Sequence, residues 1–279
     1  MRPMSETDDQ PQKRNVTALF DNVASGYDNA ALRFFPFCAD QIVGLLKPRP
    51  GQKILDVATG TGAVAVALAQ ALRPGGRVIG IDLSEAMLVK AGQNIRKMAL
   101  DNVDLFQMDA ERLEFKRAYF DASVCSFGMF FMPQMDKALR ELVRVTKPGG
   151  TVLFTSFADS AFRPMRQRMF DDLAQFGIEP SQLYMASDKL THPQDCLALM
   201  EKAGLHDARV QEKQLGYHLQ SAEDWWTIIW NSGSRRLIKL LNDDQRAQFR
   251  IKHTAEIQKL ATDKGIWMDV KVLFSSGVV

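Results

Sequence analysis

The residues best suited to binding chemistry lie in one short stretch, residues 54–65, whose sequence is ILDVATGTGAVA. An apolar strand pattern contains the acidic Asp56, and Gly60 and Gly62 follow before an alanine-rich helical pattern begins. Glycine lets a backbone turn tightly and approach a ligand where a Cβ would collide. The helix that follows directs its free N–H groups toward the same place. This stretch therefore predicts the strand, turn and helix of a nucleotide-binding sheet.

Further polar residues follow at the ends of the next predicted strands. Asp82 comes about 20 residues after the glycines, where a carboxylate suits the two hydroxyls of a ribose. Asp109 and Ala110 follow the third strand, and there a carboxylate could accept from an adenine amino group. Ser126 ends the fourth strand, and the KPGG turn at 147–150 precedes the fifth. Because ligands bind outside the carboxyl ends of open α/β sheets, we expect these residues to share one site.

The wider pattern predicts the sheet that would hold these side chains. Apolar stretches of strand length alternate with helical stretches as far as residue 157. We expect strands at 53–57, 77–81, 103–107, 120–126 and 150–156, with helices at 63–72, 84–99 and 135–145. Such alternation with short loops favours an α/β fold with a parallel sheet and helices on both faces.

After residue 157 the chain no longer continues the regular alternation of strands and helices. Helical segments rich in Met, Phe and Arg are expected at 161–176 and 181–187, and we interpret residues 158–190 as a helical lid insertion. The later elements that we expect are a helix at 193–203, a strand at 208–215, a helix opened by a capping box of Ser221 and Asp224, helices at 235–241 and 243–262, and a strand at 266–274.

At the N-terminus we expect a flexible tail over residues 1–15 and a helical cap over residues 16–46, with helices beginning near Val16 and Ala31. Residues 16–279 would then form a single domain, since no composition shift divides them.

Composition narrows the classes of function. Of the 279 residues, 46% are hydrophobic and 24% charged, and the net charge of +2 argues against a nucleic-acid-binding protein. No apolar run is long enough to span a membrane. Cys38, Cys125 and Cys196 lack metal-ligand spacing, so we expect neither a disulfide framework nor a metal site. A reducing, cytoplasmic location fits best.

Four motifs together carry a resemblance to a known family. DVATGTG at 56–62, GIDLS at 80–84, MDAERL at 108–113 and RVTKPGGTVLFTSF at 144–157 resemble class I S-adenosylmethionine-dependent methyltransferases, closest to the ubiquinone/menaquinone C-methyltransferase-like group. FDNVASGYD at 20–28 is similar to the N-terminal segment that often closes over the cofactor in that group. The resemblance implies a Rossmann-like sheet of seven strands with the last strand, expected at 266–274, antiparallel.

The resemblance also implies a cofactor and a reaction. S-adenosylmethionine would transfer its methyl group in line to a small, hydrophobic or aromatic acceptor, by C- or O-methylation. The expected cofactor-binding residues are Tyr27, Ala58, Thr59, Gly60, Thr61, Gly62, Asp82, Leu83, Met87, Asp109, Ala110, Ser126 and Phe127. Aromatic faces near the methyl group can stabilise the sulfonium cation before transfer, and Tyr27, Phe127 and Phe130 are the candidates for this role. Phe130 is also expected to bind the acceptor.

Candidates for catalysis and acceptor binding are fewer. His218 follows the predicted sixth strand and could act as a general base, and Tyr27 is a second catalytic candidate. Trp226 and Trp230 share a helix face and could form an aromatic wall for the acceptor, although core packing explains them equally simply. Arg163, in the expected lid, could grip an anionic group, with a solvated helix face as the alternative.

Other interpretations use the same nucleotide-binding start. An NAD-dependent oxidoreductase would need a hydride-handling constellation such as a Tyr/Lys pair, which we do not find. A regulatory protein that binds the cofactor without turnover is the second alternative, and methylation of a protein or RNA is the third. We expect a small-molecule acceptor, no nucleic-acid partner, and a monomer or homodimer. His206 and His253 are expected at the surface.

Overall fold

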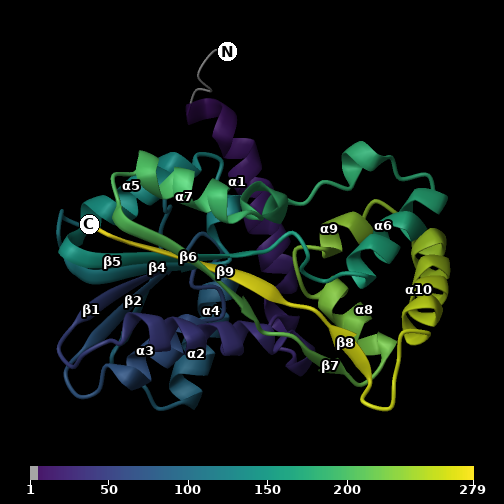
Figure 1. The fold of residues 1–279 in the computed structure, drawn as a ribbon, viewed down its shortest axis with the longest axis horizontal. Coiled ribbons are helices and arrows are strands. Elements are labelled where there is room, and N and C mark those ends of the chain that lie inside the picture. Colours follow the sequence, from purple (N-terminus) through teal and green to yellow (C-terminus); the bar gives the residue numbers. More distant parts are fainter. Residues whose placement is uncertain (1–5) are drawn as a thin grey trace.

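A mixed sheet forms the centre of the molecule in the computed structural model, which describes residues 6–279 (Figure 1). Within that range seven strands pair in the order β3-β2-β1-β4-β5-β9-β6. Their bounds are β1 Lys53–Val57, β2 Arg77–Asp82, β3 Val103–Gln107, β4 Phe120–Ser126, β5 Thr146–Phe157, β6 His206–Gln214 and β9 Lys271–Val278. β1 to β5 pair in parallel, and β9 is antiparallel to both β5 and β6. The predicted class I sheet with an antiparallel last strand is therefore confirmed.

The strand order creates a crevice at one edge of the sheet. β1 lies between β2 and β4, and Val57 at its end is in register with Ile81 and Cys125. From β1 the chain winds outward through β2 and β3, and it then returns to β4 on the other side of β1. The helices that follow β1 and β4 consequently diverge to opposite faces, which leaves room for a ligand at the carboxyl ends of these strands.

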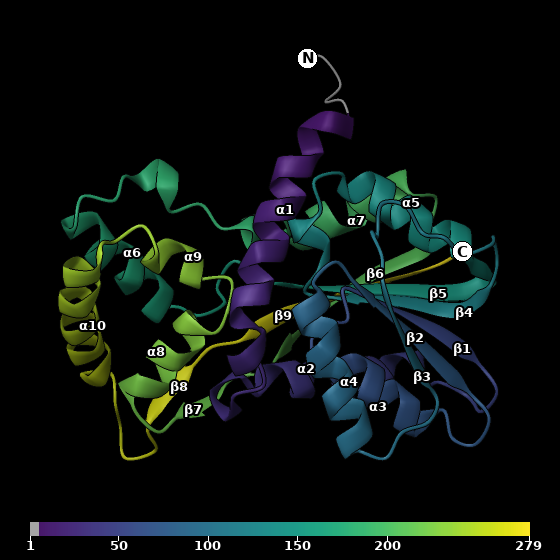
Figure 2. The same ribbon diagram turned by 180° about the vertical axis from the view of Figure 1, so that it is seen from behind.

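Helices cover both faces of the sheet, as expected (Figures 1 and 2). One face carries α2 Phe34–Leu46, α3 Ala63–Ala71 and α4 Glu85–Lys97, and the other carries α5 Met135–Val145 and α7 Pro193–Lys202. Leu68 of α3, Val124 of β4 and Leu142 of α5 are fully buried in this three-layer core. β1 and β4 lie in the middle of the sheet and are largely buried on both faces, including the polar residues Asp56 and Ser123.

An accessory lobe lies beside the sheet, on the right in Figure 1. We use this name for α6 Met165–Gln175, α8 Ala222–Trp230, α9 Arg235–Ile238, α10 Asp243–Gln258 and the hairpin of β7 Tyr217–Leu219 with β8 Ile266–Met268. The expected lid over residues 158–190 is only part of this lobe. Its helix α6 packs against α10, which comes about a quarter of the chain later. The tail of the segment forms two short 3-10 helices, Pro180–Gln182 and Ala186–Leu190, instead of the expected helix at 181–187.

The strand expected at 266–274 is in fact two strands in two sheets, β8 and β9. The side chain of Gln214 holds the break between them, because its amide accepts from the N–H of Val270 and donates to Asp269 at 2.8 Å. The part that completes the central sheet begins at Lys271.

Helix α1, Glu6–Val23, begins well before the expected position near Val16. Of the predicted flexible tail over residues 1–15, residues 1–5 lie outside the described range, and the remainder is helical. Figure 2 shows α1 crossing the molecule between the accessory lobe and the carboxyl ends of the strands. Val23 and Ala24 pack against Met87 of α4, which fixes the end of the helix against the sheet domain.

The sequence predicts side-chain caps at the starts of α4 and α8, and only the cap of α4 forms. Ser84 caps α4 as expected, since its hydroxyl accepts from the N–H of Met87 at 3.1 Å. The capping box expected from Ser221 and Asp224 does not form, because Asp224 accepts from the N–H of Gln220 instead.

Within residues 6–279, no helix combines the length and apolarity that crossing a membrane requires.

Candidate functional site

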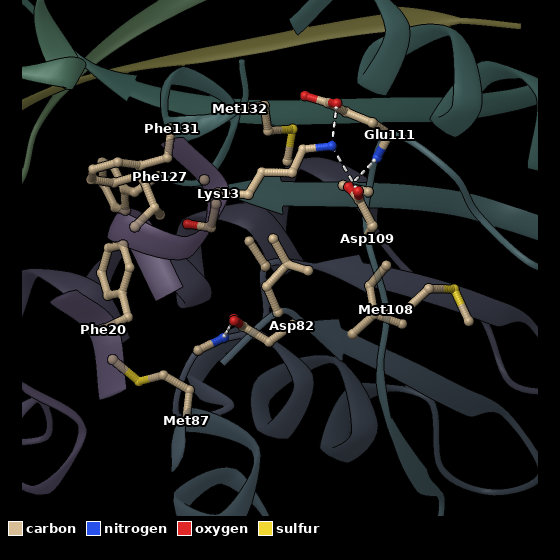
Figure 3. A pocket seen from close by; sticks show the side chains of 18 of the residues that line it. Lys13, Phe20, Asp82, Met87, Met108, Asp109, Glu111, Phe127, Phe131 and Met132 are labelled. Carbon is tan, nitrogen blue, oxygen red and sulfur yellow. Dashed lines mark hydrogen bonds and ion pairs between the residues drawn. The ribbon is translucent and has the colours of Figure 1, made fainter. Parts of the chain in front are cut away.

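The first cavity lies at the carboxyl ends of β1, β2 and β4, and Figure 3 shows it from close by. Its walls come from α1, from the turn after β1, from the end of β2 and from the loops after β3 and β4. The expected cofactor-binding residues among its lining are Tyr27, Ala58, Gly60, Asp82, Leu83, Met87, Asp109, Ala110, Ser126 and Phe127. Segments far apart in sequence therefore meet here, as their strand-end positions predict.

Three expected contacts support the cavity from behind instead of lining it. The hydroxyl of Thr59 donates to Asp56 at 2.6 Å, and the carbonyl of Thr61 accepts from Asn94. Gly62 has a φ of +87°, and a Cβ there would lie 3.2 Å from the Cβ of Ala91 in α4. These residues shape the turn that presents Ala58 and Gly60 to the cavity.

Asp82 is the central polar group of the first cavity. Its carboxylate accepts from the N–H of Gly60 at 2.8 Å and from the N–H of Ser84 at 2.9 Å, so it ties the turn after β1 to the start of α4. Burial raises the pKa of Asp82 above its ordinary value. A carboxylate oxygen has lone pairs beyond these two bonds, and these remain able to accept from ribose hydroxyls.

The turns after β1 and β4 approach each other unusually closely. Ala58 and Phe127 both adopt the left-handed backbone region, each with a φ of +53°. A Cβ on Gly128 would lie 2.6 Å from the Cβ of Ala58. Strain at two adjoining loops that line one cavity is typical of a functional site, since the surrounding fold must hold such residues in place.

Helix α1 closes the far side of the first cavity through Lys13. The Lys13 ammonium lies 2.7 Å from Asp109 Oδ2 and 2.5 Å from Glu111 Oε2, and Figure 3 shows all three side chains converging. Asp109 also accepts from the N–H of Glu111. Further along the same helix, Asp21 accepts from the hydroxyl of Ser84. Sequence reasoning missed Lys13 because it assigned residues 1–15 to a flexible tail.

A second and larger cavity, with a volume of about 840 Å³, adjoins the first. Aromatic side chains from the sheet domain line it together with residues of the accessory lobe. Among the described residues, five border both cavities: Val16, Phe20, Tyr27, Phe127 and Phe131. A group bound in the first cavity can therefore meet a group bound in the second across this aromatic junction.

The aromatic junction is a packed assembly of rings. Phe127 stacks on Phe157 at 4.3 Å between ring centroids, and Tyr27 stacks on Phe35 at 4.7 Å. Phe20 meets Phe131 edge to face at 5.0 Å. Burial raises the pKa of the Tyr27 phenol well above its ordinary value, so this hydroxyl stays protonated at neutral pH.

The structure does not bring all predicted acceptor residues to the second cavity. Phe130 lines it, but Arg163 points elsewhere and forms an exposed ion pair with Asp159 at 2.6 Å. Trp226 and Trp230 stack on each other at 6.0 Å, outside the lining of either cavity. The tryptophan that does line the cavity is their neighbour Trp225.

His218 also lies outside the lining of both cavities. It belongs to β7, whose partner is β8 and not a strand of the central sheet, and its ring contacts Trp267 at 5.1 Å. The expectation of a general base assumed that the carboxyl end of the sixth strand faces the ligand crevice and places His218 there. Instead the hairpin carries His218 into the accessory lobe.

A buried chain of side chains supports Trp225. Its indole N–H donates to His253 Nε2 at 2.9 Å, and His253 Nδ1 lies 2.7 Å from Asp172 Oδ2. Burial lowers the pKa of His253, which keeps the ring neutral with Nδ1 as the donor to Asp172. The expectation that His253 lies at the surface is wrong, since the residue is 0% exposed.

Comparison with known proteins agrees with this geometry. Residues 6–218 match the sequence model of the ubiE/COQ5 methyltransferase family. A ubiquinone/menaquinone biosynthesis C-methyltransferase from Burkholderia vietnamiensis is 33% identical over 215 residues, which cover 69% of this chain and 84% of that protein. The YcgJ protein from Bacillus subtilis superposes with a TM-score of 0.58 at 20% identity, covering 87% of this chain and 97% of that one. An S-adenosylmethionine-dependent methyltransferase from Aquifex aeolicus superposes with a TM-score of 0.54 at 16% identity, covering 91% and 97%.

The fold and the paired cavities define a class I S-adenosylmethionine-dependent methyltransferase. The chain belongs to the ubiE/COQ5 methyltransferase family. It is an enzyme whose cofactor is S-adenosylmethionine, and nothing in these comparisons favours the NAD-dependent oxidoreductase alternative. Among the described residues, no group of three or more His, Cys, Asp or Glu side chains is arranged to hold a metal ion.

Proposed function

We propose that this enzyme methylates a ring carbon of a hydrophobic, hydroxylated aromatic acceptor, such as a hydroquinone. One observation carries the proposal: the cofactor cavity opens through an aromatic junction into a large cavity lined mainly by apolar and aromatic side chains. The relative from Burkholderia vietnamiensis is named as a C-methyltransferase of ubiquinone and menaquinone biosynthesis, which supports both the ring acceptor and the carbon target.

In this proposal the first cavity holds the cofactor. Ala58 and Gly60 approach its methionine end, Asp82 accepts from its ribose, and Asp109 with Ala110 meets its adenine. Gly128 packs against Ala58 where no additional Cβ fits, so the loops after β1 and β4 are held together at the cavity wall, and this supports the assignment. When bound, the cofactor supplies an electrophilic sulfonium methyl group.

The chain itself contributes positioning and exclusion of water. The rings of Tyr27, Phe127 and Phe131 border both cavities, so they hold acceptor and methyl donor on either side of one narrow passage. Alignment at near-attack distance can supply roughly 7–11 kcal/mol of the barrier. Tyr27, with its protonated phenol, is the proposed catalytic residue and would donate a hydrogen bond to a group at the junction.

The experiment that tests this function is a turnover assay with matched acceptors. Enzyme and S-adenosylmethionine are incubated with a prenylated hydroquinone, or with the same ring after both hydroxyls have been methylated. The free hydroquinone should gain one methyl group on a ring carbon, and the blocked ring should gain none, because its carbon lacks the activating hydroxyl. Methylation at oxygen, or no transfer by protein that binds S-adenosylhomocysteine, would contradict the proposal.

A pair of variants ties the activity to the second cavity. Phe130→Leu reduces the aromatic wall and should raise KM for the acceptor several-fold with little change in KM for the cofactor. Phe106→Leu is the matched control, since Phe106 lies exposed on β3 outside both cavities. Equal effects of the two substitutions would remove Phe130 from the acceptor site.

We also propose that the enzyme acts in the cytoplasm, as a monomer or homodimer, without a nucleic-acid partner. The three cysteines are buried and unpaired, as a reducing compartment favours. Size-exclusion chromatography with light scattering measures the oligomeric state.

A further inference from the structure

The charges of the second cavity are distributed unevenly. Its lining includes three cationic residues: Arg166 in α6, Lys189 in the 3-10 helix Ala186–Leu190, and Arg236 in α9. All three come after β5 in the sequence. Within the described chain, no Asp or Glu is part of this lining. By contrast, the first cavity is bordered by three carboxylates, Asp82, Asp109 and Glu111, and by one cation, Lys13. The two adjoining cavities therefore differ in the sign of their charge.

The cations lie apart from the reactive junction. The residues that border both cavities belong to α1, to the segment after it and to the end of β4, and each carries an apolar or aromatic side chain. Arg166, Lys189 and Arg236 border the second cavity alone. An acceptor that spans the cavity would place its methylated ring at the aromatic junction and its other end among the cations.

Two of the three cations already have partners. Arg166 lies 3.1 Å from Asp188, and Arg236 donates to the carbonyl oxygens of Gln182 and Tyr184. These interactions hold the segment that carries Lys189 in place. For Lys189 itself, the described part of the chain supplies no hydrogen bond or ion pair. Burial lowers the pKa of the Lys189 ammonium, since the group is partly removed from water without a compensating carboxylate.

We propose that the acceptor carries, besides the hydroquinone ring that is methylated, a carboxylate or comparable anionic oxygen group, which is bound by Lys189 with support from Arg166. This inference rests on the assignment of the second cavity to the acceptor and deepens it by naming the charge of the substrate. An ammonium in apolar surroundings gains most from a partner of opposite charge, because little water competes for it. The anion would also orient the acceptor, with its uncharged ring toward the junction.

The test uses two fluorescent probes that share one aromatic framework and differ by a single charged group. Anilinonaphthalene sulfonate is anionic, and N-phenylnaphthylamine is its uncharged counterpart. Binding of each is measured to the full-length protein saturated with S-adenosylhomocysteine, in the wild type, in Lys189→Met and in Lys189→Arg. Lys239→Met is the matched control, since Lys239 is exposed and borders neither cavity.

Lys189→Met should weaken binding of the anionic probe by about tenfold and leave the uncharged probe within about twofold. Lys189→Arg should restore most of the affinity, and Lys239→Met should change neither probe. Equal loss of both probes, or unchanged affinity for the anion in Lys189→Met, would overturn the proposal. So would a wild type that prefers the uncharged probe. Carbon methylation of the uncharged prenylated hydroquinone is measured separately in the wild type and in Lys189→Met. This acceptor lacks the anionic group, so its turnover should be equal in the two proteins, and failure in both bears on the proposed reaction and not on Lys189.

Discussion

Lys13 of α1 bridges two carboxylates, Asp109 at 2.7 Å and Glu111 at 2.5 Å, at the edge of the first cavity. Glu111 is only 2% exposed and accepts in addition from the N–H of Gln134, while Gln134 also donates to Asp9 of α1. The helix is thus held over the cavity by polar contacts at its middle and by Phe20 near its end. Asp109, the residue expected to meet the adenine, is therefore shared between the ligand cavity and the helix that covers it.

Loss of the Lys13 ammonium should destabilise this cover. Lys13→Met leaves Glu111 buried without its cationic partner, and we expect the free energy of unfolding to fall by about 2 kcal/mol. Glu111→Gln in the same chain should recover at least half of that loss, because the unpaired charge is removed. Urea unfolding of the single and double variants measures both effects. Additive losses would show that the two side chains act independently.

Asp82→Asn should weaken cofactor binding without unfolding the protein. The asparagine side chain offers one acceptor where the carboxylate now receives two backbone N–H groups, so the turn at Gly60 and the contact to the ribose both suffer. We expect the dissociation constant for S-adenosylhomocysteine to rise by about 10- to 100-fold, measured by calorimetry. Asp263→Asn, at an exposed position, is the control. Unchanged affinity would exclude Asp82 from the ribose contact.

The stability of the protein should depend on pH through Asp56. Burial raises the pKa of Asp56 to about 7, from an ordinary value of 3.8, so the folded state binds this proton more tightly than the unfolded state. Its contribution to stability is fully present below pH 3.8 and is lost as the pH rises through about 7. Asp56→Asn cannot ionise and should gain stability relative to the wild type as the pH rises from 3.8 to about 7. A difference that stays constant with pH would contradict the shifted titration.

His253 should produce the opposite pH dependence. Burial lowers its pKa from the ordinary 6.5, so the unfolded state takes up a proton that the folded state resists. This contribution is present above pH 6.5 and is lost as the pH falls through the lowered pKa of the folded state. His253→Gln should reduce the acid sensitivity of the melting temperature and, by releasing Trp225, raise KM for the acceptor. His206→Gln, at an exposed position, should do neither.

Local sequence patterns were sufficient to predict the strand-end residues of the first cavity. The glycine turn follows β1, Asp82 is the last residue of β2, and Asp109 comes two residues after β3, and parallel strands end at one edge of a sheet. The central position of β1 and β4 in the sheet agrees with their burial on both faces. Such local patterns predict that a side chain lies at the end of a strand without any information about contacts between distant segments.

The acceptor side of the site depended on contacts that no local pattern contains. Trp225 and Trp226 are neighbours on one helix, yet only Trp225 lines the cavity, because its indole N–H bonds to His253 of α10. His218 left the predicted sheet edge because β7 pairs with β8 from much later in the chain. Lys13 lines the first cavity because its ion-pair partners, Asp109 and Glu111, lie in the loop after β3.

The sequence by itself determined the class of the enzyme, its cofactor and the strand-end residues of the first cavity, since glycine turns and buried strands impose their geometry locally. Only the tertiary structure decided which side chains border the second cavity. Two segments separated by β6 had to pack together into the accessory lobe, and this packing depends on the burial of whole helix faces. The free energy of this burial depends on both surfaces that come together. The sequence of one segment therefore does not show which of its residues remain exposed to the cavity.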